Sequence, residues 1–244
     1  MRSEKETCNF VRAVYQNNKN YWRDNASLMR KLKNAYANRM FEDISFDPTN
    51  IRVEIADSYA FIEGYISSLF SKSPAVEVGA DSVRKGNSAV VKALCNRWLY
   101  DQRQVLENGS RLALIYPNSF YKLAYKNSTV IFDRVSVRSV PPWEVITDND
   151  ASKWNEQRYV GHAYFCPVVK AKEMYGAKKF NAVVKSDYFE QNSNPYKTAD
   201  NEDIPDEYKY IEVVELYDLM YDCLYIWSPN YSGGDKLLDE VSPI

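Results

Sequence analysis

The sequence predicts an α+β protein, with N-terminal helices followed by antiparallel strands and hairpins. Before residue 116, apolar residues recur three and four positions apart, which is typical of helices with one buried face. After Pro117 that period is lost, and short apolar, aromatic and β-branched runs alternate with turn residues. Because helices and strands do not alternate along the chain, we do not expect a parallel sheet built from βαβ units.

The helical spacing predicts helices over residues 5–23, 26–40, 51–71 and 87–108, the last continuing into 110–115. Asn25 or Ser27 is the expected N-cap of the second helix, because a short polar side chain can accept a hydrogen bond from the first turn. Pro74 is expected to end the third helix, since proline cannot continue one. Residues 75–78 then look extended, as a short strand.

Extended segments are predicted over residues 120–125, 129–132, 135–140, 158–165 and 208–227. A short helix is expected over 167–175, with Pro167 at its first position and Gly176 just past its end. The last extended segment should form a hairpin that turns near residues 221–222. Within it the apolar phase slips between Val213 and Val214, which predicts a β-bulge.

Composition excludes several classes of protein. The 244 residues include one histidine and eight glycines, and neither GxGxxG nor GxxxxGK[ST] occurs, so multi-histidine metal sites and these nucleotide-binding loops are not expected. The net charge of −2 argues against a dedicated, tight nucleic-acid binder. The 20 tyrosines favour large amphipathic contact surfaces, because a tyrosine is apolar along its ring and polar at its tip.

The cysteines and the N-terminus bear on the compartment. None of the four cysteines forms a CxxC pair, so a zinc site is not expected. Cys95 and Cys223 lie in apolar runs, and we expect both to be buried, which fits a reducing cytosol. The charged start MRSEKETCNF predicts no secretory signal, and no apolar stretch approaches the roughly 18 residues of a membrane span.

Two groups of residues invite a catalytic or metal-binding interpretation without supporting it. His162 lies on a predicted strand, and the sequence points to no nucleophile or orienting carboxylate beside it, so we expect a structural or interface histidine. A second group is acidic: Glu202, Asp203, Asp206 and Glu207. Pro205 interrupts it and EF-hand spacing is missing, so a solvated loop is expected.

Two further groups leave alternatives open. Acidic and aromatic side chains gather along one polar stretch: Asp148, Asp150 and Glu156 with Trp143, Trp154 and Tyr159. Such a set would suit a glycoside hydrolase or a carbohydrate-binding module, or simply a surface loop with partly buried aromatic anchors. A basic stretch on and before the second helix would either touch DNA or an acidic partner or form a solvated face: Arg23, Arg30, Lys31, Lys33 and Arg39.

The order of several stretches is distinctive: 65–78, 94–106, 113–116, 120–123, 137–148, 158–176 and 213–219. Residues 65–78 look like an apolar helix that runs into a proline and a short strand. Residues 137–148 contain Pro141-Pro142-Trp143. In this order they resemble the N-terminal, wing-like part of tailed-bacteriophage portal proteins, over most of residues 50–227. No single motif carries the resemblance; the order does.

The resemblance implies a structural protein and not an enzyme, with no catalytic, metal or cofactor residues and no cofactor. Portal subunits form a ring, usually a dodecamer, at one capsid vertex of the virion after assembly in the host cytoplasm. Double-stranded DNA passes through the ring without sequence-specific binding. The implied partners are other copies of the chain, the major capsid protein, terminase and the head–tail adaptor, with no membrane.

The expected organisation is one wing-like domain over residues 1–244, mainly helical over 1–116 and mainly strands and loops over 117–244. Because no stem helix is visible before Ile244, we expect a fragment of a longer chain. The alternative interpretation is a carbohydrate-binding or carbohydrate-active module.

Overall fold

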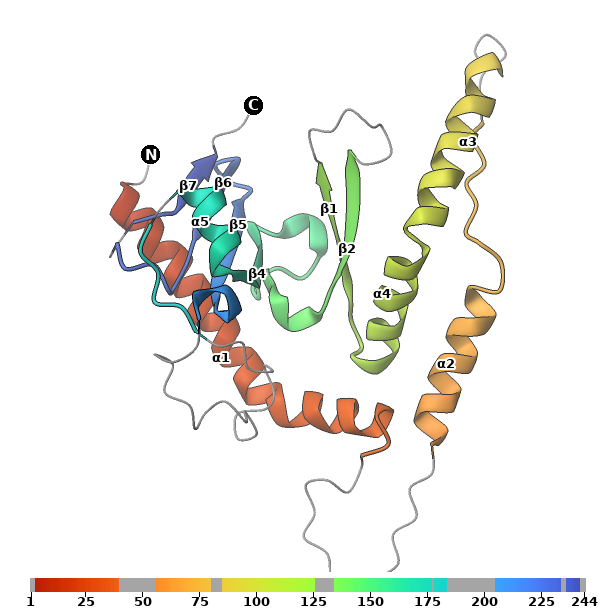
Figure 1. Cartoon of the computed structure of the whole chain (residues 1–244), viewed down its shortest axis with the longest axis horizontal. Helices are drawn as coiled ribbons and strands as arrows, with labels where there is room; N and C mark the ends of the chain where they lie inside the picture. Colours follow the sequence, from red (N-terminus) through yellow and green to blue (C-terminus); the bar gives the residue numbers. More distant parts are fainter. Residues whose placement is uncertain are drawn as a thin grey trace, which may run out of the picture. The chain divides into compact units, whose positions relative to one another are not determined.

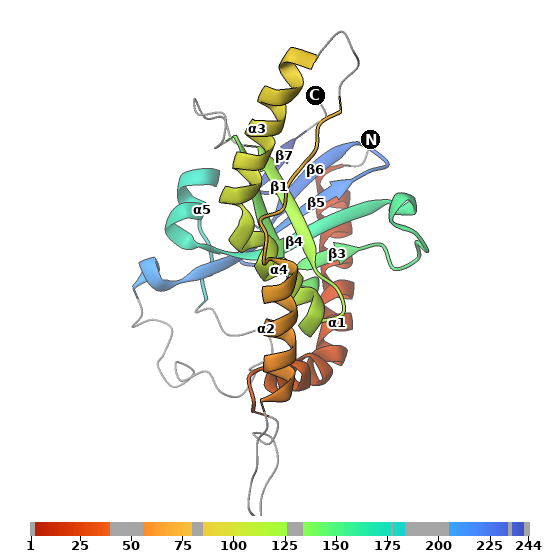
Figure 2. The same cartoon turned by 90° about the vertical axis from the view of Figure 1, so that its right-hand side faces the viewer.

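The protein folds as helices followed by antiparallel sheets, which confirms the α+β prediction (Figures 1 and 2). The computed structural model describes residues 3–39, 56–79, 85–125, 134–176, 178–183, 205–233 and 236–241. Contacts within the chain define two compact units. We call them the sheet unit (Met1–Ser27 with Trp143–Ile244) and the helical unit (Leu28–Pro142). The interpretation of the chain as one wing-like domain stays a prediction.

The first helix, α1, runs from Glu4 to Tyr36. It begins with a capping box, in which the Ser3 hydroxyl accepts from the Glu6 amide and the Glu6 carboxylate accepts from the Ser3 amide, at 3.3 and 2.8 Å. The prediction of two helices, with a cap at Asn25 or Ser27, is therefore wrong. The Asn25 side chain donates backward to the Tyr21 carbonyl at 2.8 Å, which lets it sit inside a continuous helix.

The sheet unit contains a five-stranded antiparallel meander in the order β3-β4-β5-β6-β7. Its strands are Val145–Thr147, Tyr159–Pro167, Tyr210–Asp218, Cys223–Trp227 and Asp239–Val241. The β4–β5 ladder runs without interruption from the Tyr159–Asp218 pair to the Pro167–Tyr210 pair, so the predicted bulge is not formed. The apolar phase slips because β5 is covered on both faces, and Val213 and Val214 are each fully buried on opposite sides.

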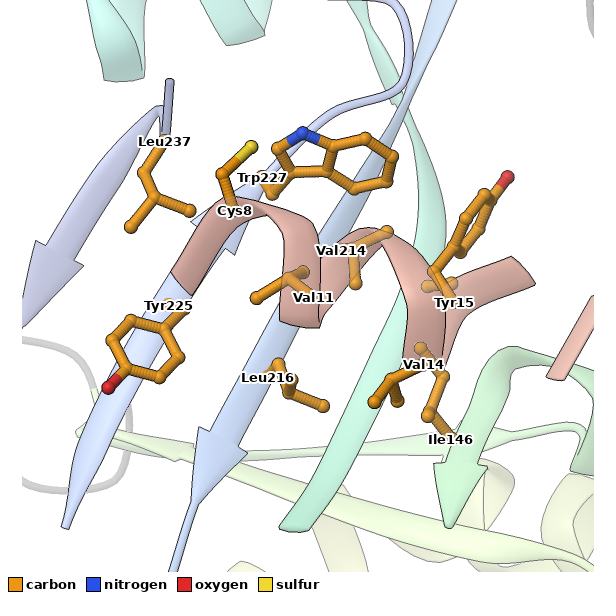
Figure 3. Close-up of a cluster of buried hydrophobic side chains, with 11 residues drawn as sticks. Cys8, Val11, Val14, Tyr15, Ile146, Val214, Leu216, Tyr225, Trp227 and Leu237 are labelled. Atoms are coloured by element: carbon orange, nitrogen blue, oxygen red, sulfur yellow. The ribbon is translucent and has the colours of Figure 1, made fainter. Parts of the chain in front are cut away.

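One face of this sheet packs against the first half of α1 (Figure 3). Cys8, Val11, Val14 and Tyr15 recur at helical spacing and bury one face of the helix. They meet side chains of alternate positions on β3 to β6, listed here: Ile146, Ala163, Val214, Leu216, Tyr225 and Trp227. The core of the sheet unit therefore joins the first helix to strands that lie between residues 145 and 227.

The opposite face of the sheet packs against α5, Val168–Tyr175. As expected, Pro167 opens this helix, here as its N-cap, and Gly176 follows it with a φ of 79°, a conformation that glycine adopts without strain. Val168 and Ala171 of α5 contact Ile211 and Val213 of β5 in a second buried cluster. Cys166 is also buried there and Cys8 in the first cluster, whereas Cys95 and Cys223 are only half-buried, so the expected pair of buried cysteines is wrong.

The helical unit contains α2 (Asp57–Leu69), α3 (Lys85–Asp101), α4 (Arg103–Ile115) and a two-stranded ribbon. The expected helix over 87–115 is divided at Gln102, and α2 ends five residues before Pro74. The ribbon pairs β1 (Phe120–Tyr125) with β2 (Val135–Val140), as both segments predict. Residues 51–55 and 129–132 lie outside the described residues.

In the part of the chain that the structure describes, residues 75–78 are not paired in a sheet. The Val76 amide donates to the Asn96 side chain of α3 at 2.7 Å, and the Asn96 amide nitrogen lies 3.4 Å from the Val76 carbonyl. A side-chain amide thus takes the place that a neighbouring strand would have. The short strand expected after Pro74 is wrong for this reason.

An ion pair and a hydrogen bond in the helical unit join α2, α4 and the last turn of α1. The Arg111 guanidinium of α4 binds both carboxylate oxygens of Glu63 in α2, at 2.6 and 3.0 Å, and the Tyr36 hydroxyl of α1 donates to Glu63 at 2.7 Å. Arg111 first, and Tyr36 second, lower the pKa of Glu63 to about 2. Burial, together with Glu63, raises the pKa of Tyr36 to about 12.

We expect Glu63→Gln to destabilise the helical unit by about 1 kcal/mol at neutral pH, because the charge-assisted bonds to Arg111 become neutral. The pKa of Glu63 is lower in the folded state than its ordinary 4.5, so the stabilisation is present above that value and lost as the pH falls toward 2. Urea unfolding at pH 7 and at pH 3 measures both effects. If the free energies of unfolding of the parent protein and Glu63→Gln differed equally at both pH values, the stabilising role of the ionised Glu63 would be contradicted.

Candidate functional site

Two loops lie side by side at one end of the sheet (Figure 2). Residues 148–158 join β3 to β4, and residues 219–222 join β5 to β6. The Leu219 amide donates to the Arg158 carbonyl at 2.9 Å, which ties one loop to the other. This end of the sheet holds five of the residues that the sequence singles out: Asp148, Asp150, Trp154, Glu156 and Tyr159.

A buried aspartate orders the first loop. Asp148 is 2% exposed, and Arg158 binds both of its carboxylate oxygens while also reaching Asp150 at 2.7 Å. The Asp148 amide donates to the Gln157 side chain at 2.7 Å, which closes the loop on itself. Arg158 is the main cause that lowers the pKa of Asp148 from 3.8 to about 2.

A second buried aspartate orders the turn. Asp218 is 2% exposed, and its carboxylate accepts from the amides of Met220 and Tyr221, at 3.1 and 3.3 Å. Asp222 follows with a φ of 51°, in the left-handed region that aspartate tolerates better than most residues. The Asp218 carboxylate therefore holds the backbone of the turn from its buried side.

These ordered loops present large apolar side chains to solvent. We call Trp154, Leu219, Met220 and Tyr221 the loop-end patch; they are between 50 and 71% exposed. Turns normally carry polar residues, and apolar aromatic and methionine side chains are the types enriched at protein interfaces. Because the buried aspartates have already ordered the backbone, contact through this patch would cost little further conformational entropy.

The same geometry weakens the glycoside hydrolase interpretation. A general acid needs a carboxyl group with a raised pKa, whereas Arg158 keeps Asp148 ionised and also pairs with Asp150. The Glu156 carboxylate also has a cation nearby, since the Lys153 ammonium of the same loop lies 3.9 Å from its Oε1 atom. Of the aromatic residues, Trp143 is half-buried, and Tyr159 packs edge-on against Phe10 with ring centroids 5.7 Å apart. The carboxylates thus act as structural ion-pair partners.

His162 lies on β4 and is 5% exposed. Its Nε2 atom is 3.3 Å from the Glu144 carboxylate, and its ring stacks on Tyr164 at 4.7 Å. The Tyr164 hydroxyl donates to Glu215 at 2.7 Å, and burial together with that carboxylate raises the pKa of Tyr164. This packing favours a structural histidine, which stays a prediction.

Among the described residues, the remaining candidate groups are not assembled into a site. Glu202 and Asp203 lie outside the described residues, and Asp206 and Glu207 belong to a short 3-10 helix, Asp206–Tyr208. The basic residues are spread along α1 and just past its end, and exposed Arg23 lies 3.8 Å from Asp24. In the part of the chain that the structure describes, no three His, Cys, Asp or Glu side chains are grouped so as to hold a metal ion.

The helical unit carries a second exposed apolar surface that the sequence pattern does not reveal. Ile62 and Ile66 line the buried side of α2, and Phe70 just beyond it is buried as well. A parallel row one position earlier is 52 to 72% exposed, and we call it the α2 stripe: Phe61, Tyr65 and Leu69. Helical spacing places these three side chains one turn apart on the same side of the helix.

The next helix shows the same feature. On α3, none of the side chains described over residues 88–101 is fully buried, and Val90, Val91 and Leu94 are exposed. Isolated helices of this length are marginal in water and depend on packing of an apolar face. The helical unit therefore presents apolar rows on two helices.

Comparisons with known proteins add no family. Neither a scan against protein-family models nor a search of curated proteins gives a match for this chain. Within the described residues, no helix combines the length and the hydropathy that crossing a bilayer requires.

Proposed function

We propose that the chain is a structural, non-enzymatic subunit of a phage portal ring. In this role, identical subunits form a ring at a capsid vertex, usually of twelve copies, through which double-stranded DNA is packaged and ejected. The major capsid protein, terminase and the head–tail adaptor are its other partners. The order of elements from α2 to β6 is compatible with the resemblance that suggests this role.

The α2 stripe is the observation that carries the proposal. Three large apolar side chains form a contiguous exposed row on one side of this helix, and such exposed apolar surfaces are typical of contact sites, those with other proteins included. In a ring, each subunit must bind a neighbour on both sides, and such a heterologous contact uses two different surfaces of one chain. The α2 stripe and the loop-end patch lie on separate units of the chain and offer two surfaces of suitable chemistry.

The near-neutral charge supports the DNA-conducting part of the proposal. Each phosphate that a protein neutralises adds salt-dependent affinity, so a channel through which DNA slides should carry little net positive charge. The chain has 31 basic and 33 acidic residues. Electron microscopy and native mass spectrometry of the complete protein test the proposal: closed rings support it, and a monomer that persists under assembly conditions argues against it.

We expect Phe61→Glu to reduce ring assembly by at least about tenfold, because a charge would be buried in the contact between copies. The measurement is the fraction of protein in the ring, from native mass spectrometry at fixed concentration. Ser67→Glu is the matched control, since it adds the same charge at an exposed polar position of the same helix. Equal ring fractions for both variants would remove the α2 stripe from the interface.

A further inference from the structure

A hollow of about 460 Å³ lies on the sheet unit, and the residues that line it are not those of the loop-end patch. Among the residues that the structure describes, six line it: Lys172, Lys178, Lys179, Phe180, Asn181 and Ser232. They come from α5, from the segment that follows it and from the turn after β6. Three of these six described residues are lysines and none of the six is acidic, unlike the balanced charge of the whole chain.

The walls of the hollow are fixed by backbone hydrogen bonds. The Ser232 amide donates to the Lys179 carbonyl at 3.1 Å, and the Asn181 amide donates to the Asn230 carbonyl at 2.7 Å. The Asn230 side-chain amide donates a hydrogen bond to the Asn181 carbonyl at 2.9 Å. The segment that carries two of the lysines is thereby attached to the turn after β6 before any ligand arrives.

One of the cations is held in place. The Lys178 ammonium donates to the Leu238 carbonyl at 2.6 Å and lies 5.5 Å from the centre of the Tyr231 ring. Lys172 projects from the last turn of α5, and Lys179 is exposed beside Phe180. Three lysine side chains lie among the described residues that line this concave surface, and such a composition favours an anionic ligand.

We propose that this hollow binds a compact ligand that carries phosphate groups, such as a nucleotide, with its phosphates against the lysines and its apolar part toward Phe180. Lysine binds phosphate as a compact point charge with three donors. The volume lies within the range of about 300 to 1,000 Å³ that small-molecule sites occupy. This inference is independent of the proposed ring assembly.

Isothermal titration of the full chain at low salt tests the site, with ATP and tripolyphosphate as compact probes and a short DNA duplex as the third. We expect both compact probes to bind, and Lys179→Glu or Lys172→Glu to weaken that binding by at least about tenfold. The binding should also weaken as salt is raised, because the contacts are electrostatic. Ring formation by the same variants is expected to be unchanged.

The matched control is Lys170→Glu, which makes the same charge change on the same helix outside the lining of the hollow. Lys170→Glu should leave the affinity for ATP and tripolyphosphate within about threefold of that of the parent protein. Equal losses of affinity for Lys170→Glu and Lys179→Glu would contradict a specific site, because the general electrostatic field of the surface would then explain the effect. Binding of the duplex alone, or no heat with either compact probe at millimolar concentrations, would overturn the proposal.

Discussion

Leu216→Ala is expected to destabilise the sheet unit by about 3 kcal/mol, because the change leaves a cavity in the core between α1 and the sheet. Leu216 is fully buried on β5, opposite Gly161 of β4, and belongs to the cluster of Figure 3. Chemical unfolding followed by circular dichroism measures the loss. Leu219→Ala removes the same atoms from the exposed turn after the same strand and should cost less than about 0.5 kcal/mol.

Gly161 offers a second test of this packing. A Cβ atom at position 161 would lie 2.9 Å from the Leu216 side chain, 3.0 Å from the Glu215 carbonyl and 3.2 Å from Ile146. Gly161→Ala should therefore destabilise the protein when Leu216 is present and cost less when Leu216 is alanine. Strict additivity of the two changes would contradict the contact between these positions.

Arg158→Ala is expected to lower the melting temperature by roughly 5 °C at neutral pH, because it leaves the carboxylate of Asp148 buried without its cation. The difference in melting temperature between Arg158→Ala and the parent protein should shrink as the pH falls. In the parent protein the pKa of Asp148 lies near 2, below its ordinary 3.8, so its stabilisation is present above that value and disappears toward pH 2. In the variant, burial without the guanidinium should raise the pKa of Asp148 and protonate it earlier.

Two comparisons sharpen the Arg158 experiment. Lys153→Ala removes an exposed cation from the same loop, and its shift should stay within about 2 °C. Asp148→Asn in the Arg158→Ala background should recover part of the loss, because the neutral amide can still accept the bond from Asp150. Equal effects of Arg158→Ala and Lys153→Ala would show that Asp148 does not depend on its cation.

Neither buried aspartate can be recognised as a loop anchor from the sequence. Asp148 is one of several acidic residues in a polar stretch, and Asp218 is one acid at the end of an apolar run. The first becomes an anchor because β4 brings Arg158 back to it, and the second because the turn directs two amides at its carboxylate. The spacing of carboxylates and aromatic residues suggested a carbohydrate site, but the spacing holds no information on which cation neutralises which acid.

The errors in the fold prediction have a common cause. The apolar pattern predicts a bulge at Val213–Val214 only if one face of the strand is buried, whereas α1 and α5 cover both faces. The polar residues near Asn25 predict a break because such residues favour caps, whereas the Asn25 side chain bonds within the helix. In both cases a local pattern has more than one meaning, and only the neighbouring elements select among them.

The sequence by itself determined the class of fold and the elements with strong local signals. The helical period before residue 116, the alternation in β1 and β2, and the Pro167 and Gly176 that bound α5 act over a few residues and need no distant partner. The tertiary structure alone decided which apolar rows are buried, so that Ile62 and Ile66 form core while the α2 stripe faces solvent. The tertiary structure also assembled two separate features, the lysine-lined hollow and the Glu63–Arg111 pair. Contacts between residues far apart in the chain depend on how whole elements pack.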